Sequence, residues 1–220
     1  MPPLDADVQR LMIPTSDGIE LEAELIGTGE SSVGVVITHP HPTYGGSMHT
    51  PVPQKLFEVA SSLGLPAIRF NFRGVGASGG THDGGVAERL DVVAAIDALC
   101  AAGVASVLLA GWSFGADVAL AVDHKRVARW FAVAAPLAVV PVDEMIAGSD
   151  DRPVVLAVPE HDQFCVPEVA QERTAAWRNV SIEMVGGADH FLAGKLHLVG
   201  DLFEATAKAL TSDATDLTRD

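Results

Sequence analysis

Hydrophobic and polar positions alternate along this chain with two periods, and these periods distinguish predicted strands from predicted helices. An alternation of period two over residues 8–13 and 19–26, on either side of a Thr-Ser-Asp-Gly turn, predicts an antiparallel β-hairpin. Hydrophobic runs predict further strands at 33–38, 66–72, 106–110, 130–135, 154–158 and 180–185. Hydrophobic positions at helical spacing predict helices over 51–63, 86–102, 166–178 and 195–210, and a shorter helix directly after residue 113.

Strands that alternate with helices predict an α/β fold. We expect a three-layer sandwich: a mostly parallel, twisted sheet with an antiparallel N-terminal hairpin and helices on both faces. The length of 220 residues fits one domain, which we place at residues 1–212, followed by a polar tail at 213–220. In such sheets functional sites form beyond the carboxyl ends of the strands, and loops rich in Gly, Pro and His follow several strand ends here.

The composition narrows the range of partners. Hydrophobic residues make up 48% of the chain, and 29 acidic against 14 basic residues leave a net charge of −15. A surface of this sign repels phosphate backbones and anionic lipids, so we expect no nucleic acid and no membrane as partner. Two isolated cysteines and the lack of a signal-like N-terminus favour a cytoplasmic protein. A small-molecule substrate, bound by a monomer or homodimer, is the remaining expectation.

One stretch joins a strand pattern to a helix pattern, with a serine between the two. Residues 106–121 read SVLLAGWSFGADVALA, so that a hydrophobic strand enters Gly111-Trp112-Ser113-Phe114-Gly115 and a helical pattern leaves it. In this setting the motif G-x-S-x-G predicts a nucleophile elbow, in which glycines let strand and helix approach and a strained turn exposes the serine hydroxyl. The flanking strand and helix argue against a chance match.

A serine hydroxyl needs a base to take its proton and an acid to orient that base. After a nucleophile elbow, the chain order is acid and then histidine, each in a loop that follows a later strand. His190 lies in the loop after the last predicted strand and fits the base. Asp162 closes the loop after the preceding strand and fits the acid, with Glu160 as the nearby rival and Asp189 as a weaker one.

An acyl-transfer site also needs two N–H donors for the oxyanion. The backbone N–H of Phe114, directly after the serine, is one candidate. The second should come from the loop HPHPTYGGSM, which follows the strand 33–38. Because proline has no N–H, His41 or a residue near Tyr44 must supply it.

The segments GWSFG, HPHPTYGGSM, FNFRGVGASGG and GADHF together resemble the α/β-hydrolase superfamily, from the third predicted strand to the last helix. The chain is most similar to its small, lidless bacterial serine-hydrolase branch, comparable in size to dienelactone hydrolase and related to serine esterases and peptidase-like hydrolases. The resemblance implies an enzyme that cleaves an ester, with an amide, a thioester or a lactone as the alternatives, and that needs no cofactor and no metal. It implies Ser113 as nucleophile, Asp162 as acid, His190 as base, and the N–H groups of His41 and Phe114 as the oxyanion hole.

The segment that holds a cap in larger members is short here. Only residues 137–152 separate the strand after the elbow helix from the acid-bearing strand, which leaves room for a loop and a short helix. We therefore expect an open cleft with weak exclusion of water and modest selectivity for long acyl chains. The bulky residues that are candidates to line it are Tyr44, Met48, Trp112, Phe164 and Phe191.

Three other interpretations use the same sequence differently. Gly74–Gly79 matches G-x-G-x-x-G after a strand, although further glycines prolong the loop where a dinucleotide site needs a helix to begin. His39 and His41 have metal-ligand spacing and, with residues such as His82, would make a metal-dependent hydrolase, although prolines bend the segment away from strand geometry. A catalytically silent member of the same fold, acting as a binding protein, is the third alternative.

Overall fold

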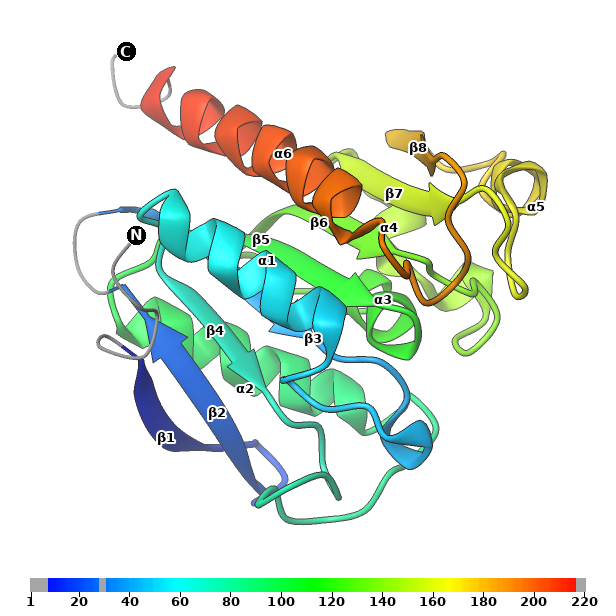
Figure 1. Cartoon of the computed structure of the whole chain (residues 1–220). Helices are drawn as coiled ribbons and strands as arrows, with labels where there is room; N and C mark the ends of the chain where they lie inside the picture. Colours follow the sequence, from blue (N-terminus) through cyan, green and yellow to red (C-terminus); the bar gives the residue numbers. More distant parts are fainter. Residues whose placement is uncertain (1–7, 28–30, 217–220) are drawn as a thin grey trace.

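The computed structural model describes residues 8–27 and 31–216, in which eight strands form one sheet (Figure 1). The strands are β1 (Gln9–Pro14), β2 (Glu20–Ile26), β3 (Val33–Thr38), β4 (Ala67–Phe70), β5 (Ser106–Trp112), β6 (Val127–Val133), β7 (Val154–Pro159) and β8 (Val180–Val185). The helices are α1 (Pro51–Ser62), α2 (Glu88–Ala101), α3 (Phe114–Leu120), α4 (Ile146–Ser149), α5 (Pro167–Arg173) and α6 (Leu196–Asp216), with 3-10 turns η2 (Pro42–Tyr44) and η3 (Val142–Glu144).

The strand order across the sheet is β1-β2-β4-β3-β5-β6-β7-β8. β1 pairs antiparallel with β2, and β2 with β4, while the other neighbouring strands pair in parallel. The predicted mostly parallel sheet with an antiparallel N-terminal hairpin is confirmed. Because β3, β5, β7 and β8 run in the same direction, the loops that follow them meet at one edge of the sheet.

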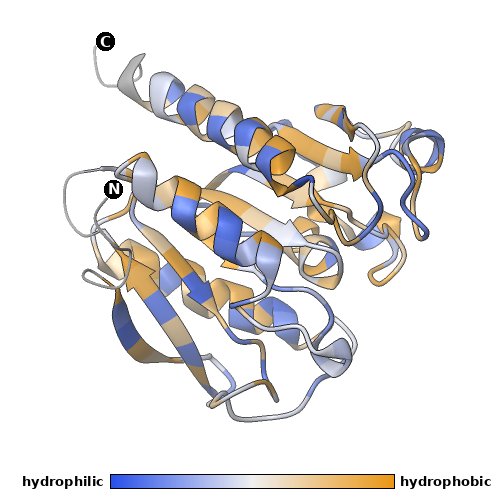
Figure 2. Cartoon of the chain, viewed as in Figure 1, coloured by the Kyte–Doolittle hydropathy of each residue, from blue (hydrophilic) through white to orange (hydrophobic). Residues whose placement is uncertain are grey.

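Helices cover both faces of the sheet, and the sheet divides the hydrophobic core into two layers. α1 and α6 lie side by side on one face, where Leu56, Phe57 and Phe203 are buried (Figure 1). α2 and α3 cover the other face, with Val92 and Ile96 among the buried residues. Figure 2 shows hydrophobic colour along the central strands and mixed colour along α1 and α6. The predicted three-layer sandwich is confirmed.

The last helix is longer than its hydrophobic pattern predicts. α6 continues through residues 213–216, where a polar tail was expected, and residues 217–220 lie outside the described part of the chain. The Arg129 guanidinium on β6 donates to Asp213 Oδ2 at 3.0 Å, an ion pair that a hydrophobic pattern does not reveal. Among the described residues, neither α6 nor any other helix is both long and apolar enough to cross a membrane.

By contrast, α5 is shorter than predicted, because the chain turns after Arg173 to pack Trp177 against α4. The contact is so close that a Cβ on Gly148 would lie 2.7 Å from Trp177 Cδ1. Nearby, the Arg178 N–H donates to the Gly148 carbonyl oxygen at 3.1 Å. A helix continued over 174–178 would carry Trp177 away from this position.

The connection between β6 and β7 contains only η3 and α4, which are three and four residues long. These two short elements are too small to form a helical cap over the edge of the sheet. The open architecture expected from the length of this segment is therefore present.

The turn between β5 and α3 depends on two glycines. A Cβ on Gly111 would lie 2.7 Å from the Gly115 carbonyl oxygen, and a Cβ on Gly115 would overlap the His39 carbonyl oxygen. The Thr38 hydroxyl at the end of β3 donates to that Gly115 oxygen at 2.8 Å. Strand and helix thus approach as closely as the elbow motif predicts.

Replacing Gly115 by Ala should lower the free energy of unfolding by about 2 to 3 kcal/mol, because the added methyl group meets backbone atoms that move only if β3 moves. Urea denaturation followed by circular dichroism measures the change. Gly186→Ala is the matched control: its Cβ would come no closer than 4.0 Å to Glu160 Oε2, and its effect should stay within about 0.5 kcal/mol. Equal losses in the two variants would contradict this account of the turn.

Candidate active site

Ser113 occupies the tip of the turn between β5 and α3 in a left-handed backbone conformation, with φ 55° and ψ −122°. This conformation costs a non-glycine residue about 1 to 3 kcal/mol. It is held by the Ser113 N–H, which donates to the Val133 carbonyl oxygen at 2.9 Å, and by the Ala116 N–H, which donates to the Ser113 carbonyl oxygen at 2.9 Å. The side chain faces His190, whose Nε2 lies 2.9 Å from Ser113 Oγ.

His190 lies between this serine and a carboxylate. Its Nδ1 is 2.9 Å from Oδ2 of Asp162, whose side chain is completely buried. The other oxygen of Asp162 accepts the backbone N–H groups of Phe164 at 2.8 Å and Cys165 at 3.2 Å. Because the carboxylate is an acceptor, Nδ1 of the neutral imidazole carries the proton and Nε2 presents its lone pair to the hydroxyl.

Glu160, the rival acid, is engaged elsewhere. Its Oε2 accepts the Gly187 N–H at 2.6 Å, and the neighbouring His161 N–H donates to the Ala188 carbonyl oxygen at 2.9 Å. Both contacts join the loop after β7 to the loop after β8. The geometry therefore selects Asp162 as the partner of the imidazole and makes Glu160 a brace between the two loops.

Three aromatic side chains surround His190. Trp112 is buried, and its Nε1–H donates to the His190 carbonyl oxygen at 3.3 Å. Phe164 and Phe191 are 59% and 61% exposed, and their ring centroids lie 4.5 and 5.5 Å from that of the imidazole. Asp189, the weaker acid candidate, accepts the Phe191 N–H at 3.1 Å. Phe164 and Phe191 thus flank the site at the surface, whereas Trp112 supports it from inside.

His39, at the end of β3, is buried. Its Nε2 accepts the Phe72 N–H at 3.0 Å, and its Nδ1 donates to the Pro40 carbonyl oxygen at 2.6 Å. Burial lowers the pKa of His39 to about 4, because the cationic form would lose its hydration. A neutral His39 therefore fastens the loop after β3 to the end of β4.

The two residues predicted to supply the oxyanion donors contact each other through their side chains. The rings of His41 and Phe114 pack with centroids 5.0 Å apart. Among the described residues, neither backbone N–H has an acceptor, which leaves both groups available to a ligand. Burial and the neighbouring His82 lower the pKa of His41, which favours its neutral form.

The remaining two candidates for the cleft wall differ from each other. Tyr44 is 85% exposed, and its ring centroid lies 4.7 Å from that of His41, at the rim of the site. Met48 is buried and borders a groove with Ala23 of β2, while its N–H donates to Asn71 Oδ1 at 2.9 Å. Because Met48 is only 1% exposed, the prediction that it lines the cleft is corrected.

The alternative sites lack the required geometry. Both ring nitrogens of His39 have protein partners, so this residue has no lone pair to offer a metal beside His41. Within residues 8–27 and 31–216, no three His, Cys, Asp or Glu side chains are grouped as metal ligands would be. Gly74–Gly79 closes a turn in which the Gly74 N–H donates to the Gly79 carbonyl oxygen at 2.9 Å. α2 begins only at Glu88, too late to face a pyrophosphate at this turn.

A buried carboxylate beneath the elbow escaped the sequence analysis. Asp117 on α3 accepts the backbone N–H groups of Leu137, Ala138 and Val139, each at 2.9 Å. Burial raises the pKa of Asp117 to about 6, against the opposing effect of these hydrogen bonds. The contacts tie the loop after β6 to the elbow helix. The one signal in the sequence is an acid inside the hydrophobic run FGADVAL.

No family model matches the chain. It is 30% identical over 175 residues to the uncharacterized protein RP471 of Rickettsia prowazekii (strain Madrid E). The aligned region covers 73% of this chain and 72% of that protein. Its structure is similar to that of an alpha-beta serine hydrolase homologue from Coxiella burnetii, with a TM-score of 0.80 and 29% identity over 90% of this chain and 96% of that chain. The chain belongs to the α/β-hydrolase superfamily.

Two further structures share the fold of this α/β-hydrolase. XC6422 from Xanthomonas campestris, a serine hydrolase without a lid, has a TM-score of 0.77 and 23% identity over 96% of this chain and 98% of that chain. The esterase Pf2001 of Pyrococcus furiosus has a TM-score of 0.79 and 20% identity over 92% of each chain. The lidless neighbour agrees with the short β6–β7 connection, and the neighbours together support a hydrolase.

The buried His39 makes the stability of this α/β-hydrolase depend on pH. Its folded pKa of about 4 lies below the ordinary value of 6.5, so its contribution to stability is complete above pH 6.5 and is lost as the pH falls toward 4. Relative to His39→Gln, which does not titrate, the wild type should lose about 3 kcal/mol of unfolding free energy between pH 7 and pH 4. Urea denaturation at several pH values measures this difference, in which groups common to both proteins cancel. A constant difference would show that His39 titrates normally.

Proposed function

We propose that this α/β-hydrolase is a serine hydrolase that cleaves carboxylic esters of small or medium-sized substrates through an acyl-enzyme. One observation carries the proposal: Asp162 Oδ2, both ring nitrogens of His190 and Ser113 Oγ form a continuous line, with 2.9 Å at each contact. The strained backbone of Ser113 and its place before α3 support it. The proposed chemistry uses no cofactor.

In the first half-reaction, His190 Nε2 takes the proton of the Ser113 hydroxyl as Oγ attacks the ester carbonyl carbon. The carbonyl oxygen becomes an oxyanion, which the N–H groups of Phe114 and His41 would bind. The imidazolium that forms is stabilised by the Asp162 carboxylate. It then gives its proton to the leaving alkoxide, and the alcohol departs from an acyl-serine.

In the second half-reaction, water replaces the alcohol. His190 takes a proton from the water, the hydroxide attacks the acyl carbon, and Ser113 Oγ leaves with the proton that His190 returns. The connection between β6 and β7 holds only η3 and α4, so no helical cap has to move to admit this water. The side chains of Asp162 and His190 are themselves buried, so the imidazolium–carboxylate pair is shielded from bulk water by the groups held rigidly around it.

The rim of the site supports an acyl group of modest size. Phe164 and Phe191 offer exposed apolar surface on the His190 side, and Tyr44 lies on the side of the loop after β3. Esters are preferred to amides here because an alkoxide leaves more readily than an amine. The esterase activity in the name of the Pyrococcus furiosus neighbour agrees with this choice.

A fluorophosphonate probe should add once to the purified protein, on Ser113, because only a serine activated by a base reacts with it. Intact mass and peptide mapping locate the adduct. Ser113→Ala should retain the fold by circular dichroism and take up no probe. An unlabelled, folded wild type would contradict the proposal and would favour the silent binding-protein alternative.

Hydrolysis of p-nitrophenyl acetate should separate the two candidate acids. Asp162→Asn should lower kcat by about 10³- to 10⁴-fold, because the imidazole loses the partner that fixes its tautomer and stabilises its cation. Glu160→Gln keeps an acceptor for Gly187 and should lower kcat by less than about tenfold. A large loss in Glu160→Gln with a small one in Asp162→Asn would reverse the assignment of the acid while leaving the serine mechanism in place.

A further inference from the structure

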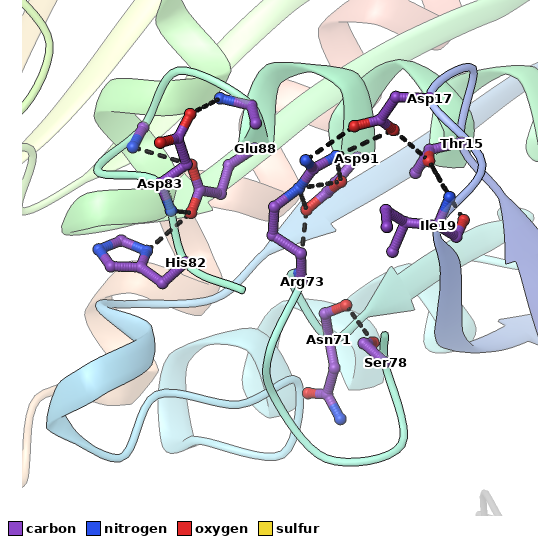
Figure 3. Close-up of polar contacts among 12 residues, drawn as sticks. Thr15, Asp17, Ile19, Asn71, Arg73, Ser78, His82, Asp83, Glu88 and Asp91 are labelled. Atoms are coloured by element: carbon purple, nitrogen blue, oxygen red, sulfur yellow. Dashed lines mark hydrogen bonds and ion pairs between the residues drawn. The ribbon is translucent and has the colours of Figure 1, made fainter. Parts of the chain in front are cut away.

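The loop between β4 and α2 lies beside the candidate active site, and the proposed mechanism uses none of its residues. Polar side chains hold the start of the loop through hydrogen bonds and ion pairs (Figure 3). Arg73 pairs with Asp91 at 2.6 Å and with Asp17 at 2.9 Å. Further along, the Ser78 hydroxyl donates to the Asn71 carbonyl oxygen at 2.7 Å. This part of the loop is therefore rigidly attached to the sheet and to α2.

Glu88 holds the end of the same loop. Its side chain is completely buried, Oε1 accepts the Asp83 N–H at 2.8 Å, and Oε2 accepts the Gly85 N–H at 2.9 Å. Oε1 also lies 2.7 Å from Nδ1 of His82 (Figure 3). Because a carboxylate accepts this bond, Nδ1 of His82 carries a proton and the orientation of the ring is fixed. Glu88 and His82 thus form a second carboxylate–imidazole pair.

The His82 ring packs against the two residues that would supply the oxyanion donors. Its centroid lies 4.9 Å from that of His41 and 5.2 Å from that of Phe114, and those two centroids are 5.0 Å apart. The three rings are thus in mutual contact. A change in the position of the His82 ring would therefore act on both neighbouring residues.

We propose that His82 is a positioning residue whose ring, packed against those of His41 and Phe114, sets the spacing of the two N–H groups. The inference rests on the proposed function, because it concerns the oxyanion of acyl transfer. His82 acts through the two neighbouring rings and touches neither Ser113 nor the substrate. Oxyanion donors stabilise the transition state only within about 3 Å of the place that the oxygen reaches. A small displacement therefore lowers kcat while leaving KM nearly unchanged.

Three substitutions separate the packing of the ring from its hydrogen bond. His82→Ala removes both and should lower kcat for p-nitrophenyl acetate by about tenfold or more, with KM changed by less than about twofold. His82→Gln retains a donor for Glu88 without the ring and should resemble His82→Ala. His82→Phe retains the ring without the donor and should restore kcat to within about threefold of the wild type. Val86→Ala, an exposed position on the same loop, is the matched control and should leave both parameters unchanged.

A boronic acid supplies the readout that a loss of stability would not produce. Phenylboronic acid adds to an active serine as a tetrahedral anion, so its dissociation constant should rise by the same factor as kcat falls in His82→Ala and His82→Gln. His82→Phe should bind it as the wild type does.

The results that would overturn the proposed function differ from those that would overturn this proposal. Wild-type kcat and boronate affinity in His82→Ala would overturn it, and so would an increase confined to KM. A His82→Phe variant as impaired as His82→Ala would assign the effect to the hydrogen bond and would equally overturn the packing role. Failure of the proposed function differs from all of these, because the wild type would then be no more active than Ser113→Ala and would not react with the fluorophosphonate.

Discussion

The close approach of α3 to the end of β3 is the contact on which the site depends. The Thr38 hydroxyl binds the Gly115 carbonyl oxygen, and the missing side chains of Gly111 and Gly115 allow that distance. Because strand and helix are so close, the chain must turn sharply at the residue between them. Ser113 therefore adopts a backbone conformation with positive φ, and its side chain is directed toward His190.

Buried charges in this protein serve mainly to hold loops. Asp117 ties down the loop after β6, Glu88 the end of the loop before α2, and Asp91 its start through Arg73. A buried carboxylate is costly unless its lone pairs are filled, and each of these accepts several N–H groups. The hydrophobic core therefore compensates the cost of burying these carboxylates, and the carboxylates in turn fix the conformation of irregular segments. The described residues between β6 and β7 form no helical cap that could pack on these segments instead.

Much of this structure could be predicted from the hydrophobic pattern, because strands buried by helices on both faces leave an unmistakable signal. The candidate nucleophile and base also followed from chain order, since G-x-S-x-G between a strand and a helix restricts where its partners lie. The acid stayed open between Glu160 and Asp162, which lie two residues apart after the same strand. Only the fold reveals that the first contacts Gly187 and the second His190.

The errors had a common physical origin in contacts between distant segments. Met48 lies in a glycine-rich loop that adjoins the site, yet its backbone is held by Asn71 and its side chain is buried. The end of α6 carries an ion pair with Arg129, from a strand more than 80 residues earlier. Asp117 has its backbone partners about 20 residues later. No periodicity within a window of ten to twenty residues contains such information.

The brace formed by Glu160 has a consequence for the acid and the base. Glu160 and His161 bind the backbone of the loop that carries His190, so the loops after β7 and β8 are fastened together. Trp112, the last residue of β5, donates its Nε1–H to the His190 carbonyl oxygen and ties the same loop to the strand that precedes Ser113. The backbone of His190 is therefore held from the side of the acid and from the side of the nucleophile, by contacts that do not involve its imidazole ring.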